Sequence, residues 1–175
     1  MKRVAVFGKP GSGKSTLSRA LSVATGLPLH AVDSLFYQAD GDVVDRPIFD
    51  AAHDKIVASD HWILDGFGPM DAFHKRLEAA DTLIYIDLPY AMSYWFVTKR
   101  LLKGVMIKPQ GWPDGASVLK GSLQSYRVLK MCPKFWNQDF MARLKTLADY
   151  KTLYVIRCGA ELNGFVDSYC RPDDG

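Results

Sequence analysis

One segment near the start of the chain has the residue types and the spacing that bind a phosphate chain. Residues 8–15 read Gly-Lys-Pro-Gly-Ser-Gly-Lys-Ser and fit the pattern G-x-x-x-x-G-K-[ST] in full. Glycines allow successive backbone N–H groups to turn inward around an anion, and a following helix points its positive end at the same anion. Lys14 would reach the β- and γ-phosphates of a nucleotide, and the Ser15 hydroxyl would ligate Mg²⁺.

The surroundings of this segment also suit a phosphate-binding loop. An apolar run, residues 4–7, precedes it, and a helical pattern begins at Lys14. A chance glycine turn is the alternative, but it would rarely meet both conditions. The pattern therefore predicts ATP and Mg²⁺ as cofactors. The nucleotide would lie on the whole loop and the first helical turn, which are Gly8, Lys9, Pro10, Gly11, Ser12, Gly13, Lys14, Ser15 and Thr16.

Three aspartates each follow an apolar run that predicts a strand. In open α/β sheets ligands bind beyond the carboxyl ends of the strands, so these side chains could share one site. Asp65 would hold Mg²⁺ or its water together with Ser15, or it would cap the helix that begins near Met70. Asp33 would accept the proton of an attacking hydroxyl, contact the metal or cap the next helix. Asp87 is better explained as a cap or turn residue.

Residues 99–134 are strongly basic, with eight lysines and arginines and one acid, whereas the whole chain has a net charge of +3. A cationic segment after the fourth strand suits a lid that closes over a triphosphate and excludes water. Arg100 and Arg127 are the best candidates for phosphate contact, because a guanidinium grips phosphate oxygens in pairs. A solvated helix face is the alternative. Trp112, Tyr126 and Trp136 stand among these charges and are more often packing residues than platforms for nucleic-acid bases.

Short apolar runs alternate with helical periodicity along the chain. Strands are predicted at residues 4–7, 29–32, 62–64, 82–86 and 152–156. Helices are predicted from residue 14 to a stop at Gly26, and at residues 48–59, 70–80, 90–102, 117–131, 134–150 and 161–166. The alternation predicts an α/β fold whose parallel sheet is covered on both faces. A Gly/Pro-rich segment, residues 103–115, interrupts the rhythm.

The composition excludes several other classes of protein. The chain has 175 residues, of which 48% are hydrophobic, so it can form a core. Its three cysteines, Cys132, Cys158 and Cys170, are far apart and predict reduced thiols, without a disulfide framework or a zinc site. No run approaches the roughly 20 apolar residues of a membrane span, so we expect no membrane association and a cytoplasmic location.

Four segments together resemble the adenylate-kinase-related proteins often labelled DNA topology modulation proteins. In chain order they are residues 8–16, Val32-Asp33-Ser34-Leu35-Phe36-Tyr37, Trp62-Ile63-Leu64-Asp65-Gly66 and Ile84-Tyr85-Ile86-Asp87-Leu88-Pro89. The resemblance covers nearly the whole chain. It implies a three-layer α/β/α P-loop NTPase fold, with five parallel strands in the order 2-3-1-4-5 and a helical lid insert. One domain would span residues 1–175, with the basic lid at about 99–134.

The resemblance also implies where the acceptor binds. The acceptor would lie near Asp33, Phe36 and Tyr37, with Gly66 and Phe67 completing its site. In adenylate kinases an arginine that grips the acceptor phosphate follows the third-strand segment. Residues 68–70 are Gly-Pro-Met here, so that arginine is absent.

Residues and resemblance together predict an ATP- and Mg²⁺-dependent kinase, related to the nucleoside monophosphate kinases, whose small acceptor is a nucleotide, a nucleoside or a similar molecule. Its catalytic residues would be Lys14, Asp33, Arg100 and Arg127. Two alternatives stay open, a nucleotide-regulated DNA- or RNA-binding protein and an ATPase without an acceptor. Nucleic acid is the less favoured partner, because the sequence contains no helix-turn-helix, zinc finger or strongly basic arm. The sequence specifies neither the acceptor nor the oligomeric state.

Overall fold

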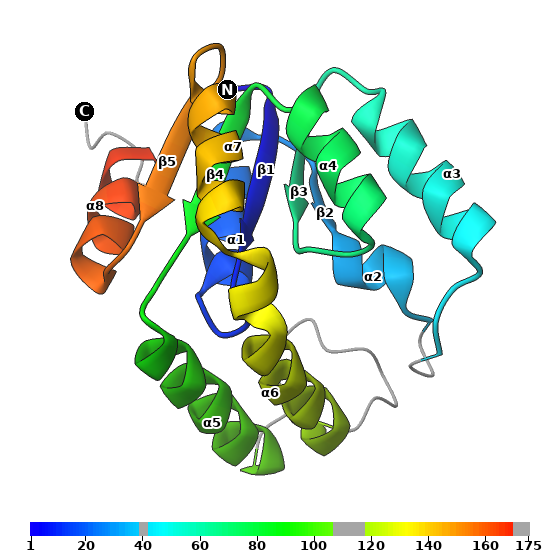
Figure 1. The fold of residues 1–175 in the computed structure, drawn as a ribbon. Coiled ribbons are helices and arrows are strands. Elements are labelled where there is room, and N and C mark those ends of the chain that lie inside the picture. Colours follow the sequence, from blue (N-terminus) through cyan, green and yellow to red (C-terminus); the bar gives the residue numbers. More distant parts are fainter. Residues whose placement is uncertain (39–41, 107–117, 170–175) are drawn as a thin grey trace.

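A parallel sheet forms the centre of the computed structural model, which describes residues 1–38, 42–106 and 118–169. Its strands are β1 (Arg3–Gly8), β2 (Leu29–Ala31), β3 (Trp62–Asp65), β4 (Thr82–Ile86) and β5 (Thr152–Ile156). All neighbouring strands run parallel, in the order β2-β3-β1-β4-β5 (Figure 1). This confirms the predicted sheet and its strand order.

Helices cover both faces of the sheet. Successive side chains of β1 point to opposite faces, so Ala5 and Phe7 enter one core while Val4 and Val6 enter the other. Helices α3, α4 and α7 cover the first core, and α1 and α8 cover the second (Figure 1). The bounds of these helices are α1 (Lys14–Thr25), α3 (Arg46–Val57), α4 (Met70–Ala79), α7 (Gln138–Ala148) and α8 (Gly159–Tyr169). The molecule therefore has the three predicted layers.

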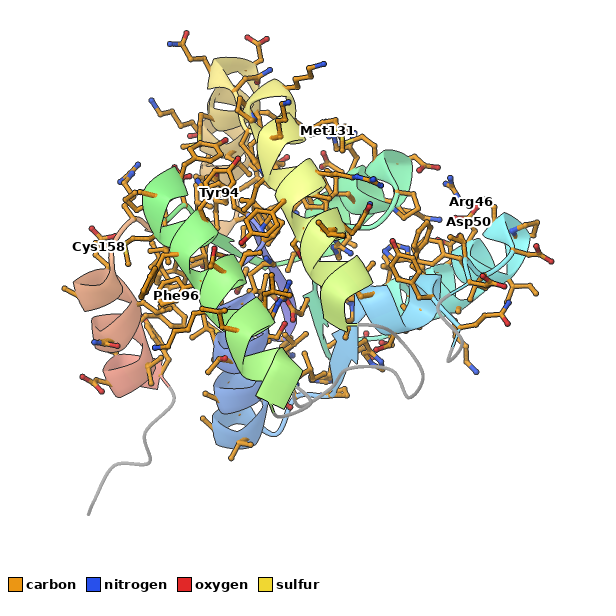
Figure 2. The ribbon with its side chains drawn as sticks, turned by 90° about the horizontal axis from the view of Figure 1, so that it is seen from below. Arg46, Asp50, Tyr94, Phe96, Met131 and Cys158 are labelled. Carbon is orange, nitrogen blue, oxygen red and sulfur yellow. The ribbon has the colours of Figure 1, made fainter. Side chains whose placement is uncertain are left out.

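Two further helices lie side by side beyond the end of β4, namely α5 (Tyr90–Met106) and α6 (Val118–Phe135) (Figures 1 and 2). The ring of Tyr94 on α5 stacks on the ring of Tyr126 on α6, with 6.0 Å between the centroids. Arg100 Nη2 donates a hydrogen bond to Ser125 Oγ at 2.6 Å. The predicted insert between β4 and β5 is thus helical where the structure describes it.

The connection from α6 to α7 is fixed by a capping residue. Asn137 Oδ1 accepts a hydrogen bond from the backbone N–H of Phe140 at 3.0 Å, which satisfies one of the free amides that begin α7. Most of the Gly/Pro-rich segment 103–115, including Trp112, lies outside the described residues. Within the described ranges, no helix combines the length and the apolar character needed to cross a membrane.

The main departure from the predicted elements lies after β2. The strand ends at Ala31, and a short helix α2 (Val32–Phe36) follows it. Hydrophobic periodicity did not indicate this helix, because five residues are too few to display a helical repeat. The prediction that Asp33 ends a strand is therefore wrong, since Asp33 lies in the first turn of α2. The remaining helices begin and end within a few residues of their expected positions.

Candidate active site

The loop between β1 and α1 turns where glycine permits a geometry that other residues do not. Gly8 has a φ of 149°, and a Cβ atom there would lie 2.3 Å from the carbonyl oxygen of Ile86 in β4. Gly13 has a φ of 85° and precedes α1. The first N–H groups of a helix have no acceptor within the helix. The Thr16 N–H donates to the carbonyl oxygen of Gly13 at 3.1 Å, so the N–H groups of Lys14 and Ser15 are the ones available to an anion at this loop.

Lys14, the first residue of α1, extends its side chain back across the loop. Its Nζ donates to the carbonyl oxygen of Lys9 at 2.7 Å. Burial lowers the pKa of Lys14, while the negative charges of Asp65 and Asp33 act in the opposite direction. The ammonium is therefore close to two carboxylates that come from β3 and α2.

Asp65, the last residue of β3, lies beside Ser15. Asp65 is only 5% exposed and accepts a hydrogen bond from the Ser15 side chain. Burial raises the pKa of Asp65, whereas Lys14 and the bond from Ser15 lower it. The Oδ1 atom of Asp65 is buried and has no hydrogen-bond partner in the described part of the chain.

These two residues fit a magnesium ion. Mg²⁺ in phosphate sites takes one or two protein oxygens and completes its shell with water and phosphate oxygens. The orphaned Oδ1 of Asp65 and the adjacent Ser15 hydroxyl provide such a pair. No group of three or more His, Cys, Asp or Glu side chains could hold a metal among the described residues, so the metal would depend on phosphate for further ligands.

Helix α2 carries the residues predicted to receive the acceptor. Asp33 is exposed, and its charge acts on Lys14. The pKa of Tyr37 is raised by burial and then by the charge of Asp33, so the two side chains are close. The ring of Phe36 meets the rings of Tyr37 and Phe49 at centroid distances of 5.1 and 5.5 Å. Asp33 and Tyr37 thus join the cluster at the loop, while Phe36 packs toward α3.

The turn that follows β3 passes close to α2. A Cβ atom at Gly66 would lie 3.2 Å from the Cβ of Val32, which precedes Asp33. The ring of Phe67 packs on Trp136 at a centroid distance of 5.3 Å and lines a cavity of about 280 Å³ between α4 and the α6–α7 junction. None of the other predicted site residues lines this cavity. The rings of Phe67 and Trp136 pack against each other and against Phe73.

The two predicted lid arginines differ in their positions. Arg100 is half-buried on α5; burial lowers its pKa, and the charge of Asp33 raises it. The charge of Arg100 also acts on Lys14. Arg127 is exposed on α6, and no contact ties it to these groups in the described ranges. The structure therefore brings Arg100, and not Arg127, to the phosphate loop. Arg46, the first residue of α3, lies at the far edge of the molecule, where it forms an ion pair with Asp50 (Figure 2).

The side chain of Lys9 is occupied by a contact that the sequence did not reveal. Its side chain is 3% exposed and forms an ion pair with Asp87, which follows β4. The Lys9 ammonium also lies 4.7 Å from the centroid of the Tyr90 ring. Asp87, for which a cap or turn was expected, forms an ion pair that ties the phosphate loop to the segment before α5.

A buried arginine on α4, Arg76, was not predicted from the sequence. Arg76 is 0% exposed, and its Nη2 donates to the carbonyl oxygens of Gly66 and Phe67 at 2.8 and 3.1 Å. Burial lowers the pKa of Arg76 to about 10. A signal was present, because Arg76 falls on the helix face that Phe73 and Leu77 define as apolar. A charged residue at an apolar position is a candidate for a buried role.

Solved structures have a similar fold, although neither a protein-family model nor a curated protein matches the sequence. A shikimate kinase from Acinetobacter baumannii, in complex with shikimate, is similar with a TM-score of 0.56 and 14% identity, over 96% of this chain and 90% of that chain. The chain has the three-layer α/β/α P-loop fold. At such identity the likeness establishes the fold and leaves the activity to be argued.

A second solved structure is more distant in shape. It is an unliganded sugar kinase from Janibacter sp. HTCC2649, with a TM-score of 0.46 and 17% identity, over 97% of this chain and 94% of that chain. The resemblance to the adenylate-kinase-related proteins is finer than either comparison and stays a prediction.

Proposed function

We propose that this protein is an ATP- and Mg²⁺-dependent phosphotransferase that acts on a small acceptor. The observation that carries the proposal is the geometry of the phosphate loop at the start of α1. There the Lys14 ammonium and the paired Ser15 and Asp65 side chains stand beside amides that an anion can reach. This set offers N–H donors, a cation and a metal site where the β- and γ-phosphates of a nucleotide would lie.

Residues 8–16 would bind the nucleotide, and Ser15 with Asp65 would hold the metal. A bound Mg²⁺ would neutralise negative charge on the phosphate oxygens. Lys14 would do the same from the protein side, since its side chain already crosses the loop. Arg100 would stabilise charge on the transferred group. Arg127, exposed on α6, would reach the phosphates only after the insert closes.

The acceptor would bind between α2 and the turn after β3. Asp33 is exposed near Lys14, so its carboxylate would accept the proton of the attacking hydroxyl. The acceptor oxygen then bonds to the γ-phosphorus, the bond to the bridging oxygen breaks, and ADP leaves. Phe36 and Tyr37 supply aromatic surface, and the lack of a side chain at Gly66 lets the turn approach Val32 closely. With the family resemblance, these residues favour a nucleoside or nucleotide as the acceptor.

A coupled assay of ADP release, run over nucleosides, nucleoside monophosphates and small hydroxylated metabolites, tests the proposal. At least one compound should stimulate ADP release saturably. Lys14→Ala should lower that turnover by roughly 100-fold or more, because a cation beside the transferred charge is lost. Lys55→Ala, on the exposed surface of α3, is the matched control and should retain turnover. Unchanged turnover in Lys14→Ala, with an unchanged circular dichroism spectrum, would contradict the role of the loop.

The alternatives give different results in the same experiments. An ATPase without an acceptor would release ADP at a rate that none of the compounds changes. A nucleotide-regulated nucleic-acid-binding protein would bind duplex DNA with a steep dependence on salt, and ATP would alter that affinity.

A further inference from the structure

Arg76 is the most deeply buried cation in the described structure that the proposed chemistry does not use. Its Nη2 makes both of its hydrogen bonds, to the carbonyl oxygens of Gly66 and Phe67. Its Nε and Nη1 are buried without a hydrogen-bond partner among the described residues. Most buried polar groups in proteins are paired, so an arginine kept in this state calls for a reason.

The turn that Arg76 holds connects the two sides of the candidate site. Gly66 follows Asp65 directly, and its own N–H donates to the carbonyl oxygen of Val6 at the end of β1 at 3.1 Å. Gly66 has a φ of 122° and lies against Val32, the residue before Asp33. The position of this turn therefore sets how far the metal-side carboxylate lies from the acceptor-side carboxylate.

The charge of Arg76 acts on the same two carboxylates. Asp65 and Asp33 both raise the pKa of Arg76, and Asp33 also raises the pKa of Asp65, because like charges repel. A fixed cation near both of them offsets this repulsion. Arg76 thus attracts both carboxylates electrostatically, in addition to donating hydrogen bonds to the turn between them.

We propose that Arg76 is the positioning residue of the acceptor side, which holds the Gly66–Phe67 turn and thereby sets the separation of Asp65 and Asp33. Because Arg76 is fully buried, it would contact neither the nucleotide nor the acceptor directly. In adenylate kinases an arginine follows the segment after the third strand. Arg76 contacts the corresponding turn in this chain, but it does so from α4. The proposal rests on the proposed function for its catalytic consequence. Its structural consequence can be measured without any substrate.

The structural test uses the Gly66 amide as a reporter, since its hydrogen bond to Val6 depends on the position of the turn. Arg76→Met should speed hydrogen exchange of this amide by about tenfold or more, and Arg76→Lys should speed it less because a donor and a charge remain. Arg143→Met is the control, because Arg143 bonds to Glu78 on the surface of α4. Unchanged hydrogen exchange of the Gly66 amide in Arg76→Met would overturn the proposal. If Arg76→Met fails to fold, Arg76→Gln is measured in its place.

The catalytic test separates positioning from general damage. With the acceptor found in the ADP-release screen, Arg76→Met should lower kcat/KM for the acceptor by about 10- to 100-fold, and Arg76→Lys should recover part of it. The Kd for MgATP, measured with a fluorescent ATP analogue, should stay within about twofold. Equal losses in ATP affinity and acceptor turnover, or no rescue by lysine, would overturn the positioning role. If wild type has no acceptor, the proposed function fails, while Gly66 exchange still decides whether Arg76 holds the turn.

Discussion

Replacing Asp87 by asparagine should destabilise the protein much more than removing Lys9, although both changes break the same ion pair. The Lys9 side chain is 3% exposed, whereas the Asp87 side chain is 31% exposed. Asp87→Asn therefore removes the negative charge beside a cation that water hardly reaches, and leaves it a neutral amide oxygen and the Tyr90 ring, whose centroid is 4.7 Å away. Lys9→Met leaves a carboxylate that water can still hydrate.

The exposed fractions of the Lys9 and Asp87 side chains determine how much the two losses of stability differ. Stranding a buried charge costs about 3–5 kcal/mol, and the aromatic ring offsets up to about 1 kcal/mol. We therefore expect Asp87→Asn to lower the free energy of unfolding by about 3 kcal/mol. Lys9→Met should lower it by about 1 kcal/mol or less, the usual worth of a pair with a solvated partner. In a chain of this size these losses correspond to about 6–12 °C and about 2–4 °C in Tm.

Urea unfolding followed by circular dichroism, on both single variants and the double variant, measures these values. The double variant should be nearly as stable as Lys9→Met, because no buried cation remains, which gives a coupling energy of about 3 kcal/mol. The reasoning is refuted if Asp87→Asn costs no more than Lys9→Met, or if the coupling energy is near zero. Either result would mean that the Lys9 ammonium is hydrated in the folded protein.

Four further substitutions test the local structure by urea unfolding. Gly8→Ala should cost about 3 kcal/mol or more, because its Cβ would lie 2.3 Å from a backbone oxygen of β4, whereas Gly26→Ala, with a φ of 71° but open space, should cost about 1–2 kcal/mol; equal losses would contradict this. Asn137→Ala should cost about 1 kcal/mol by removing the cap of α7, and no loss would mean that the cap is dispensable. Burial lowers the pKa of His53, so the unfolded chain binds a proton first as the pH falls below about 6.5, and stability is lost there. His53→Leu should make the decline in stability below that pH shallower, and an unchanged slope would show that His53 does not cause it.

The parts of the fold that the sequence predicted are those with a dense local pattern. β4 matches its apolar run, because a strand buried on both faces carries few polar interruptions. β5 matches its run as well, although as the edge strand it is only partly buried. The stop of α1 at Gly26 follows from its left-handed conformation. Helix α2 was missed because it is shorter than two turns, so the chain beyond β2 appeared to continue as a strand to Asp33.

The candidate site likewise has parts that could be predicted from the sequence and parts that could not. The phosphate loop was predictable because its residues are consecutive and their spacing is dictated by one anion. The partners of the two buried cations were not predictable from the sequence. Lys9 and Asp87 are 78 positions apart, and Arg76 is 10 positions from Gly66, whose carbonyl oxygen it contacts. Such pairings depend on which strands lie next to each other. Local periodicity carries no information on that, although it did mark Arg76 as a misplaced charge.

The two cations that sequence reasoning missed act on opposite sides of β1. β3 and β4 are the neighbours of β1 in the sheet, and each ends in a turn beside the phosphate loop. Arg76 fixes the turn after β3, and Lys9 fixes the residue that follows β4. Both flanks of the loop are thus held by buried charges before any ligand binds, which is how a site avoids reorganisation during charge transfer. Asp33 and Arg127 are exposed, and neither forms an ion pair with another side chain in the part of the chain that the structure describes. We therefore expect nucleotide binding to leave the turns after β3 and β4 in place, and acceptor binding to move α2 and α6.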